Sequence, residues 1–330
     1  MRKFCFKIMA FVLFALTLTA FTGCNNSKKL ELYLIGGQSN ACGYTPYTNK
    51  HTEVFENVWY AGMTDKQLVS DVQNSGSNNL FAFDAYLPFV KAGCGTSINH
   101  IGPEYGMAKV FNDKYQKKTK AFIFKTGAGG TSIHGKTQSV YGNWCPKSLW
   151  PEGYTPNITT PSKENNPMGI LYHLFVENFR TVYNTLKENG YNPVVKGMAW
   201  MQGEQDLSNP GLMRYRETLM TFITDLRNDL AQITGDRKLK SMPFVIGKIS
   251  PSFGYWNNPF VTSMNMAQDM IAEDLKNVCT VEVDDLYITD ENDNPVGPDR
   301  CHYSFKDMVT LGERFGTALL EMKTDSFFSF

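Results

Sequence analysis

The sequence predicts an α/β protein, a three-layer α/β/α sandwich built on a mainly parallel, five-stranded sheet. The first observation is a set of short, almost continuously apolar runs, which is typical of strands covered on both faces. They span residues 32–37, 121–127, 194–203, 243–250 and 278–283. The second observation is a set of longer segments with apolar residues at helical spacing. They span residues 103–118, 169–190, 209–232, 258–277 and 304–322. Alternation of this kind implies parallel strands with helices on both faces of the sheet.

The segment 169–190 shows the helical pattern most clearly. Its apolar residues recur three or four positions apart: Leu171, Leu174, Phe175, Phe179, Val182 and Leu186. Gly190 follows directly and is a typical signal for the end of a helix. No linker rich in Pro, Gly or Ser divides the chain, so we expect one folded domain over residues 31–330.

Two long stretches, residues 42–100 and 128–166, are weakly periodic and rich in Gly, Asn and aromatic residues. Each begins directly after a predicted strand. Long connections in a compact domain are usually functional or carry local structure of their own. Open α/β sheets also bind ligands at the carboxyl ends of their strands. We therefore expect both stretches to border a functional site.

Residues 1–23 have the character of a secretory signal peptide. Three basic residues, Arg2, Lys3 and Lys7, flank an apolar run that is too short to span a bilayer comfortably. A removed signal peptide would place the folded domain outside the cytoplasm. Its loss would leave 29 basic and 32 acidic residues, a net charge of about −3. That balance argues against nucleic acid or anionic lipid as the partner.

The signal segment ends in "AFTGC", which resembles a bacterial lipobox with Phe21 in place of the more usual Leu. The resemblance implies that Cys24 carries a lipid anchor and that residues 24–30 form a tether in the cell envelope. Ordinary secretion is the alternative that Phe21 leaves open. Neither the membrane face nor the oligomeric state follows from the sequence.

Five cysteines would remain in the mature chain besides Cys24: Cys42, Cys94, Cys145, Cys279 and Cys301. An odd number leaves at least one of them free, and five scattered cysteines do not form a disulfide scaffold. The sequence contains no CxxC or HExxH spacing, and its five histidines show no zinc pattern. We therefore expect no metal and no cofactor.

Polar or glycine-rich clusters follow four of the predicted strands. They are Gly37-Gln38-Ser39-Asn40, Gly127-Ala128-Gly129-Gly130-Thr131-Ser132, Gln202-Gly203-Glu204-Gln205-Asp206 and Asp299-Arg300-Cys301-His302. Because parallel strands end at one edge of a sheet, the clusters should converge there. A serine hydroxyl becomes a nucleophile when an imidazole takes its proton and a carboxylate orients that imidazole. Ser39, His302 and Asp299 supply these three groups.

Acyl transfer also needs donors for the oxyanion of the tetrahedral intermediate. The backbone N–H groups of Ser39 and Gly129 are suitable, and the side-chain amide of Gln202 is a third candidate. Gln38 and Asn40, which flank the serine, are expected to support the site.

The ordered motifs "GGQSN", "GPE" (102–104), "TGAGGTSI", "WMQGEQD" and "DRCH" resemble the sialate O-acetylesterase and acetylxylan esterase branch of the SGNH hydrolases, close to carbohydrate esterase family 6. The resemblance covers residues 32–320. It implies a flavodoxin-like sheet and cofactor-free hydrolysis of acetyl esters on sugars, with Ser39 as nucleophile, His302 as base and Asp299 as the orienting acid. Arg300, Cys301 and Gln205 depart from the family pattern, which affects the expected substrate preference more than the chemistry.

Other interpretations of the same residues stay open at this stage. Ser39 could cap a helix that starts near Asn40. Glu204 and Asp206 could be a glycosidase pair, although two positions on one loop are poorly placed to flank a sugar bond. We expect them to brace the site, with Asp206 as the reserve candidate for the triad acid. Cys301 could be a thiol nucleophile, a buried thiol, or half of a disulfide with Cys42.

Several other side chains at this edge could contact a sugar. His134 follows the glycine cluster, and aromatic rings pack well against sugar rings. The aromatic candidates are Trp144, Trp150, Tyr154, Tyr255 and Trp256.

The sequence thus predicts an exported carbohydrate O-acetylesterase that acts on an acetylated glycan such as acetylated sialic acid or xylan. A glycan-binding lipoprotein that keeps the fold without the chemistry is one alternative. A broad lipase or thioesterase is the other.

Overall fold

The computed structural model describes residues 28–48, 53–63, 89–116, 120–135, 142–157, 167–208 and 211–322. The predicted signal peptide and the lipidation residue Cys24 lie outside these residues. Strand β1 (Lys28–Gly37) begins earlier than predicted and pairs from Lys28 onward. Residues 28–30, which we had assigned to the tether, therefore belong to the first strand. No helix within the described ranges is long and apolar enough to cross a bilayer.

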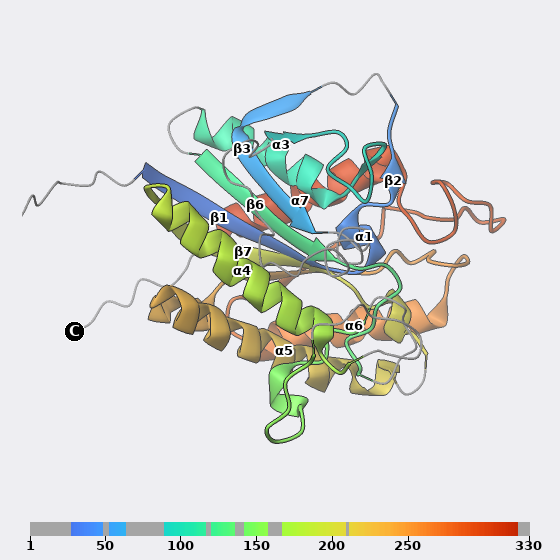
Figure 1. Cartoon of the computed structure of the whole chain (residues 1–330). Coiled ribbons are helices and arrows are strands. Elements are labelled where there is room, and N and C mark those ends of the chain that lie inside the picture. Colours follow the sequence, from blue (N-terminus) through green and yellow to red (C-terminus); the bar gives the residue numbers. More distant parts are fainter. Residues whose placement is uncertain are drawn as a thin grey trace, which may run out of the picture.

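The centre of the fold is a sheet whose strands run in the order β4-β3-β6-β1-β7-β8-β9 (Figure 1). Its five predicted members are β1, β6 (Lys120–Gly127), β7 (Tyr191–Met201), β8 (Phe244–Gly247) and β9 (Val278–Val281). All of them are parallel to their neighbours. The α/β class and the mainly parallel sheet are confirmed.

The predicted number of five strands is wrong, because the described part of the chain already forms a sheet of seven. The two additional strands are β3 (Val54–Met63), parallel to β6, and β4 (Phe89–Lys91), antiparallel to β3 at the edge. Both lie within the stretch 42–100, which we had expected to be irregular. Glu56 and Asn57 interrupt the apolar run of β3, so this strand lacks the continuous apolar pattern of the central ones. The same stretch also forms a small antiparallel pair, β2 (Thr45–Pro46) with β5 (His100–Ile101).

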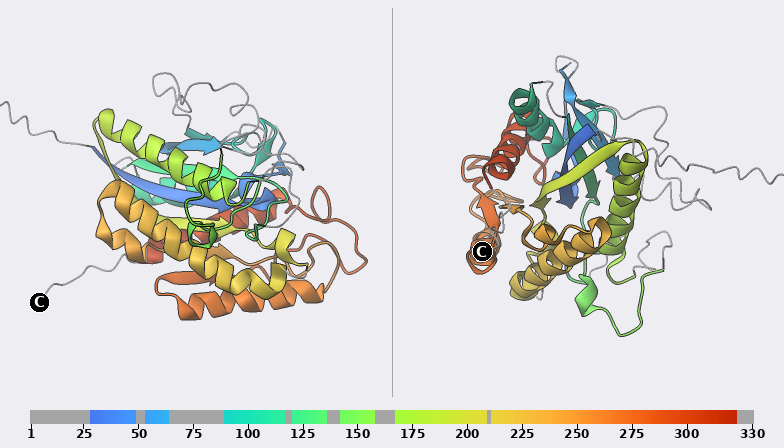
Figure 2. Two further views of the ribbon diagram at one scale, coloured as in Figure 1. Left: turned by 60° about the horizontal axis from the view of Figure 1, so that its bottom comes forward. Right: turned by 90° about the vertical axis from the view of Figure 1, so that its left-hand side faces the viewer.

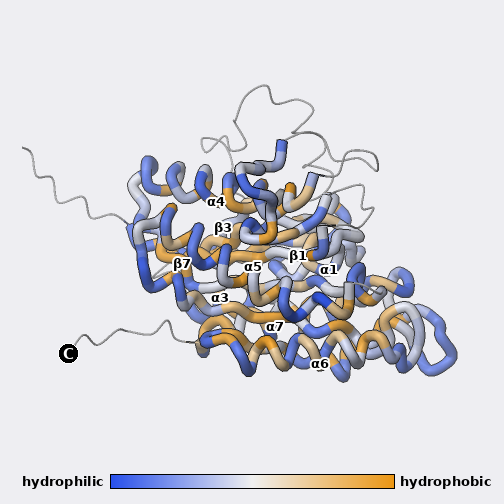
Figure 3. The backbone as a smooth tube through the Cα atoms, turned by 90° about the horizontal axis from the view of Figure 1, so that it is seen from below, coloured by the Kyte–Doolittle hydropathy of each residue, from blue (hydrophilic) through white to orange (hydrophobic). Residues whose placement is uncertain are grey.

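Helices cover the sheet on both faces, which gives three layers (Figure 2). One layer contains α4 (Ile170–Glu188), α5 (Gly211–Thr234) and α6 (Pro259–Asp274), and the other contains α3 (Pro103–Tyr115) and α7 (Phe305–Glu321). The alternation of β1 separates two cores: Leu32 and Leu34 face the first layer, whereas Tyr33 and Ile35 face the second. In Figure 3 these helices alternate between apolar and hydrophilic residues, as expected when one face of a helix packs on a sheet.

All five predicted helices are present, with ends within a few residues of the expected ones. Gly190 follows α4 with a φ of +80°, a left-handed conformation that ends a helix, so the predicted helix end at this glycine is confirmed.

The register of the sheet brings the predicted clusters together. Gly37 at the end of β1 pairs with Gly127 of β6 on one side and with Met201 of β7 on the other. The three segments that follow these residues therefore leave the sheet at one edge. This is also the end of the sheet at which helix α1 (Ser39–Cys42) lies (Figure 1).

Candidate active site

Ser39 is displayed by a sharp turn at the end of β1. Gly37 has a φ of +139°, and a Cβ atom there would lie 1.9 Å from the Met201 carbonyl oxygen, so only glycine fits. The Gln38 N–H donates to the same carbonyl (2.9 Å), and α1 begins at the next residue. Gln38 occupies the N-cap position and no side chain caps the helix, so the interpretation of Ser39 as a helix cap is wrong. Ser39 is 9% exposed.

Asp299 and His302 form a compact pair in the loop that leads into α7. Asp299 Oδ2 lies 2.7 Å from His302 Nδ1, and Asp299 Oδ1 accepts from the backbone N–H groups of Cys301 (2.7 Å) and His302 (2.9 Å). Partial burial alone would raise the pKa of Asp299, but these hydrogen bonds hold it below its ordinary value. The carboxylate therefore stays charged and fixes the imidazole through Nδ1, which leaves Nε2 for another partner.

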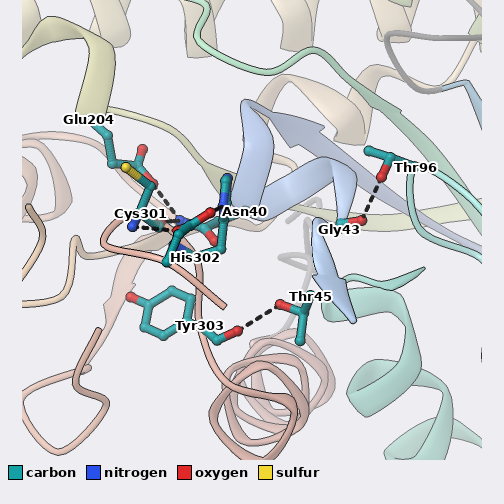
Figure 4. A network of polar contacts seen from close by, with 9 residues as sticks. Asn40, Gly43, Thr45, Thr96, Glu204, Cys301, His302 and Tyr303 are labelled. Atoms are coloured by element: carbon teal, nitrogen blue, oxygen red, sulfur yellow. Dashed lines mark hydrogen bonds and ion pairs between the residues drawn. The ribbon is translucent and has the colours of Figure 1, made fainter. Parts of the chain in front are cut away.

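The loop of His302 is docked onto the segment that begins with Ser39. Asn40 Nδ2 donates to the Cys301 carbonyl (3.1 Å), and Thr45 Oγ1 donates to the Tyr303 carbonyl (3.0 Å). The residues on both sides of His302 are thus tied to residues close to Ser39 (Figure 4). The structure brings two clusters that are more than 250 positions apart in the sequence into direct contact.

Tyr44 is a site residue that the sequence analysis missed. Its ring stacks on the His302 imidazole with a centroid distance of 5.0 Å and an interplanar angle of 10°. Together with the hydrogen bond to Asp299, this stacking restricts the rotation of the imidazole. Tyr44 follows Ser39 by only five positions, which could have indicated that it lies near the site. An isolated Tyr in an irregular segment does not, however, indicate which residue its ring contacts.

Glu204 lies behind Asn40 in the short 3₁₀ turn Glu204–Asp206. Its Oε1 accepts from Asn40 Nδ2 at 2.9 Å, so one amide group links the carboxylate to the His302 loop. Burial raises the pKa of Glu204, while Asn40 and the nearby His302 act in the opposite direction. The predicted bracing position of Glu204 and Asn40 fits these contacts.

Gln202 and Gln38 connect the loops after β1, β6 and β7. Gln202 Nε2 donates to Asp206 Oδ2 (2.6 Å) and Thr131 O (3.1 Å), and lies 3.4 Å from Gln38 Oε1. Gln38 Oε1 also accepts from the Gln205 N–H at 3.2 Å. Gln202 is fully buried. Both of its amide hydrogens have acceptors within the protein, so the geometry places Gln202 as a brace and not at the predicted oxyanion position.

Asp206 is also a structural group in this arrangement. Its Oδ2 accepts from the Ile133 N–H at 2.9 Å as well as from Gln202, and the side chain is fully buried. Burial raises its pKa to about 6. Because its partners are Ile133 and Gln202, Asp206 does not take the place of Asp299 beside His302.

Gly129 lies in the turn that follows β6. The N–H of the preceding residue, Ala128, donates to the Gly37 carbonyl (3.2 Å), so the turn starts beside the end of β1. Thr131 Oγ1 closes the turn by donating to the Ala128 carbonyl at 2.7 Å. Gly129 is thus close to the start of α1, and its role as an oxyanion donor stays a prediction.

The structure separates the aromatic candidates. Trp144 is fully buried and donates through Nε1 to Thr131 Oγ1 (3.0 Å), so the expectation that it contacts a sugar is wrong. Trp150 is half-buried and donates to the Cys145 carbonyl. Tyr255 is 41% exposed, and Trp256 packs against Tyr287.

His134 lines a separate cleft of about 390 Å³ against α5. Arg214 and Glu217 border the same cleft. The contact of His134 with a sugar stays a prediction.

All five of the cysteines Cys42, Cys94, Cys145, Cys279 and Cys301 lie within the described residues, and none of them forms a disulfide bond. A disulfide between Cys301 and Cys42 is therefore excluded in this structure. Burial and the charges of Asp299 and Glu204 raise the pKa of the Cys301 thiol, which disfavours the thiolate that a cysteine nucleophile needs. Within the described ranges, no group of three or more His, Cys, Asp or Glu side chains is arranged to hold a metal.

A buried ion pair anchors the other side of α1 and was also missed. Lys125 Nζ contacts Glu104 Oε2 (2.7 Å), the Cys42 carbonyl (2.7 Å) and the Cys94 carbonyl (2.9 Å), and both charged side chains are fully buried. Glu104 Oε1 accepts from the Gly102 N–H at 2.8 Å. The signal was a lysine inside the apolar run "AFIFKTG" together with the acid of "GPE". This pair fixes the carboxyl end of α1 and thereby the position of the Ser39 turn.

The sequence of residues 29–321 matches the family described as carbohydrate esterase, sialic acid-specific acetylesterase. The chain belongs to this family. The predicted resemblance is thus confirmed over nearly the whole described chain, and the protein is a carbohydrate acetylesterase, a hydrolase of ester bonds. The alternatives of a glycan-binding protein without chemistry and of a lipase or thioesterase lose their support.

Three solved structures are similar to the fold. A protein from Arabidopsis thaliana is 18% identical with a TM-score of 0.53, over 88% of this chain and 97% of its own. NanS is 14% identical with a TM-score of 0.57, over 89% and 98%. A carbohydrate acetylesterase from Xanthomonas citri is 16% identical with a TM-score of 0.53, over 88% and 56%. A search of curated proteins finds no match. Identities this low establish likeness of fold alone.

We expect Lys125→Met to lower the free energy of unfolding by about 3–5 kcal/mol, because the variant leaves the Glu104 carboxylate buried without its counter-charge. Urea titration followed by circular dichroism measures this. Lys109→Met is the matched control, since Lys109 pairs with Glu313 at the surface and should cost less than about 1 kcal/mol. Equal losses in the two variants would contradict the assigned role of the buried pair.

The raised pKa of Asp206 predicts a pH-dependent stability. Between the ordinary value of 3.8 and the folded value of about 6, the folded state holds a proton that the unfolded state has lost, so stability falls as pH rises. Each pH unit between these two pKa values lowers the free energy of unfolding by about 1.36 kcal/mol, so the full difference corresponds to about 3 kcal/mol. We expect the free energy of unfolding of Asp206→Asn, relative to wild type, to increase by roughly this amount from pH 4 to pH 7.

Urea titrations at a series of pH values test this expectation. Glu152→Gln, at an exposed position, is the control and should show a difference from wild type that is independent of pH. A pH-independent difference for Asp206→Asn as well would show that Asp206 ionises normally in the folded protein.

Proposed function

We propose that the protein hydrolyses acetyl esters on a glycan through Ser39, His302 and Asp299, in an SGNH-type α/β/α domain. The observation that carries the proposal is the docking of the Asp299–His302 pair onto the segment headed by Ser39, through Asn40 and Thr45. A serine at the end of a parallel strand, with an oriented imidazole on the adjoining loop, has the parts that acyl transfer requires.

In the first half-reaction, His302 Nε2 accepts the Ser39 hydroxyl proton while Oγ attacks the acetyl carbonyl carbon. Asp299, hydrogen-bonded to Nδ1, stabilises the imidazolium that forms. Collapse of the tetrahedral intermediate breaks the ester C–O bond, and the sugar oxygen leaves with the proton from His302. Water then attacks acetyl-Ser39, with His302 passing its proton to Ser39 as acetate departs.

The oxyanion of each tetrahedral intermediate needs fixed donors. The first intrahelical hydrogen bonds of α1 come from the N–H groups of Ala41 and Cys42 to the Gln38 carbonyl. The N–H of Ser39 precedes these donors, and it is the first donor that we assign to the oxyanion. Gly129, in the adjoining turn, is the second. Gln202 braces the loops, so we assign the stabilisation of the oxyanion to the backbone N–H groups of Ser39 and Gly129.

We expect Ser39→Ala and His302→Ala to lower kcat for p-nitrophenyl acetate by roughly 10⁴-fold or more, because the residues of a triad act as a unit. Asp299→Asn should also lower kcat, through loss of imidazole orientation, while far-ultraviolet circular dichroism stays unchanged. Initial rates of p-nitrophenol release measure these effects.

Ser263→Ala is the control, because Ser263 lies on the exposed side of α6. Turnover by Ser39→Ala at the wild-type rate would refute the assignment of the nucleophile.

A series of p-nitrophenyl esters from acetyl to octanoyl tests the acyl group in the same assay. A preference for octanoyl would show that the acyl pocket suits a lipase and not an acetylesterase.

We further propose that residues 1–23 are a signal peptide and that Cys24 carries a lipid anchor at the cell envelope. The basic residues, the short apolar run and the "TGC" ending support this. In bacteria fed radiolabelled palmitate, the wild-type chain should acquire the label and partition into detergent, whereas Cys24→Ser should do neither. Export of an unlabelled wild-type chain would instead support ordinary secretion.

A further inference from the structure

An aromatic pair, one ring half-buried and the other exposed, lies on two loops at the site end of the sheet. Trp256, in the loop after β8, and Tyr287, in the loop between β9 and α7, have ring centroids 4.9 Å apart and planes inclined by 33°. Tyr287 is 38% exposed. In Figure 1 the second loop, coloured orange to red, projects at the same end of the molecule as α1. The pair has no part in the mechanism above.

The two rings border a cleft of about 590 Å³. Asn292 and Val296 from the second loop form another part of its lining, and Ser304 at the start of α7 closes one side. This volume lies within the range of sites that bind small molecules. An open cleft with aromatic faces and hydrogen-bonding groups suits the apolar faces and hydroxyl groups of sugar rings.

Hydrogen bonds between the two loops hold the cleft in shape. Ser252 Oγ accepts from the N–H groups of Ile288 (2.8 Å) and Thr289 (3.0 Å), and Thr289 Oγ1 donates to the Ser252 carbonyl (2.8 Å). The Trp256 N–H donates to Asp293 Oδ1 at 2.7 Å. Because the aromatic surface is fixed before a ligand arrives, little conformational entropy is lost on binding.

The cleft adjoins the loop that carries Asp299 and His302. The Gly254 N–H donates to the Arg300 carbonyl at 2.9 Å, so the loop of Trp256 is bonded to the residue directly after Asp299. Ser304, which lines the cleft, follows His302 by two positions. A chain of sugar rings lying in the cleft would therefore extend from the reacting ester.

The charge of the lining discriminates between glycans. Four carboxylates border the cleft, those of Asp285, Asp290, Glu291 and Asp307, against one ammonium group, that of Lys306. Arg314 pairs with Asp285 and compensates one of them. The remaining negative charge repels a carboxylated sugar and accepts hydrogen bonds from the hydroxyl groups of a neutral one.

We propose that this cleft is a subsite for an uncharged part of the substrate, so that the enzyme acts on a neutral acetylated glycan chain in preference to an acidic sugar. The inference rests on the proposed function, because it places the subsite next to the proposed nucleophile. Trp256 and Tyr287 supply the stacking surface, and the surrounding carboxylates supply acceptors.

The test compares acetate release from acetylated xylo-oligosaccharides with p-nitrophenyl acetate hydrolysis. Trp256→Ala and Tyr287→Ala should each lower the ratio of kcat/KM for the oligosaccharide to kcat/KM for the small ester by about tenfold, the effect of about 1.4 kcal/mol of lost binding. Tyr255→Ala is the matched control, because this exposed neighbour is not in the lining, and it should leave the ratio unchanged. Tyr287→Ser provides a second variant if Trp256→Ala does not fold.

A second comparison tests whether the charge of the cleft selects against acidic sugars. Wild-type enzyme should release acetate faster from the neutral oligosaccharide than from O-acetylated sialic acid, and Glu291→Lys should shift this ratio toward the acidic sugar, most strongly at low salt. A wild-type preference for the acidic sugar would overturn the inference. An unchanged ratio in the aromatic variants would do so as well.

Failure of the subsite and failure of the proposed nucleophile give different results. Binding of deacetylated xylo-oligosaccharide to the Ser39→Ala protein, measured by affinity electrophoresis with and without Trp256→Ala, reports on the cleft without any turnover. If this binding depends on Trp256 while Ser39→Ala retains activity, the subsite stands and the nucleophile is wrong. If Ser39→Ala is inactive and Trp256→Ala leaves the binding unchanged, the nucleophile is assigned correctly and the subsite is wrong.

Discussion

The site depends on two hydrogen bonds that dock one loop onto another: Asn40 to the Cys301 carbonyl and Thr45 to the Tyr303 carbonyl. A parallel sheet places the ends of its strands at one edge, but it does not set the distance between the loops that leave them. These two bonds do, because they hold the backbone on both sides of His302. Thr45 is fully buried and Asn40 nearly so, and therefore losing either acceptor would leave a polar group unsatisfied, at a cost larger than the net gain of an ordinary hydrogen bond.

The docking in turn relies on polar groups buried beneath it. Asn40 is held by Glu204, and the loop of Glu204 is held by Gln38, Gln202 and Asp206. Asn40, Gln202, Glu204 and Asp206 each keep one side-chain oxygen without a hydrogen-bond partner within the described part of the chain. Such groups reduce stability. Their concentration in one place indicates that positioning, and not stability, governs the residues beneath the serine turn.

The sequence was sufficient for the features that depend on local patterns. Continuous apolar runs identified strands β1, β6, β7, β8 and β9, and helical spacing with a terminal Gly190 identified α4. Strand β3 was not recognised because Glu56 and Asn57 interrupt its apolar run, which removes the pattern. Asp299 and His302 were paired correctly because three positions in a turn bring their side chains together whatever the rest of the fold does. Local sequence patterns could not predict the roles of side chains whose partners are distant in the sequence.

Lys125, Tyr44 and Gln202 show this limit in physical terms. The burial of Lys125 depends on Glu104 and on two carbonyls from separate loops, and the contact of Tyr44 depends on the docking of the His302 loop. Gln202 follows β7 where an oxyanion donor is expected, yet its amide hydrogens are taken by Asp206 and Thr131. In each case the sequence supplied the chemical group, and the packing of distant segments decided what the group contacts.

Three carboxyl groups near the site occupy two kinds of environment, and this difference decides which of them can serve the imidazole. Glu204 and Asp206 are buried, and burial raises the pKa of both, so their charge is costly. The Asp299 side chain is 50% exposed, and hydrogen bonds from its own loop keep its pKa low. A group that stabilises an imidazolium must remain charged throughout the reaction, and a partly solvated carboxylate with three local donors does so at little cost. The buried acids are suited to holding amides and N–H groups in place, which is the use that the structure makes of them.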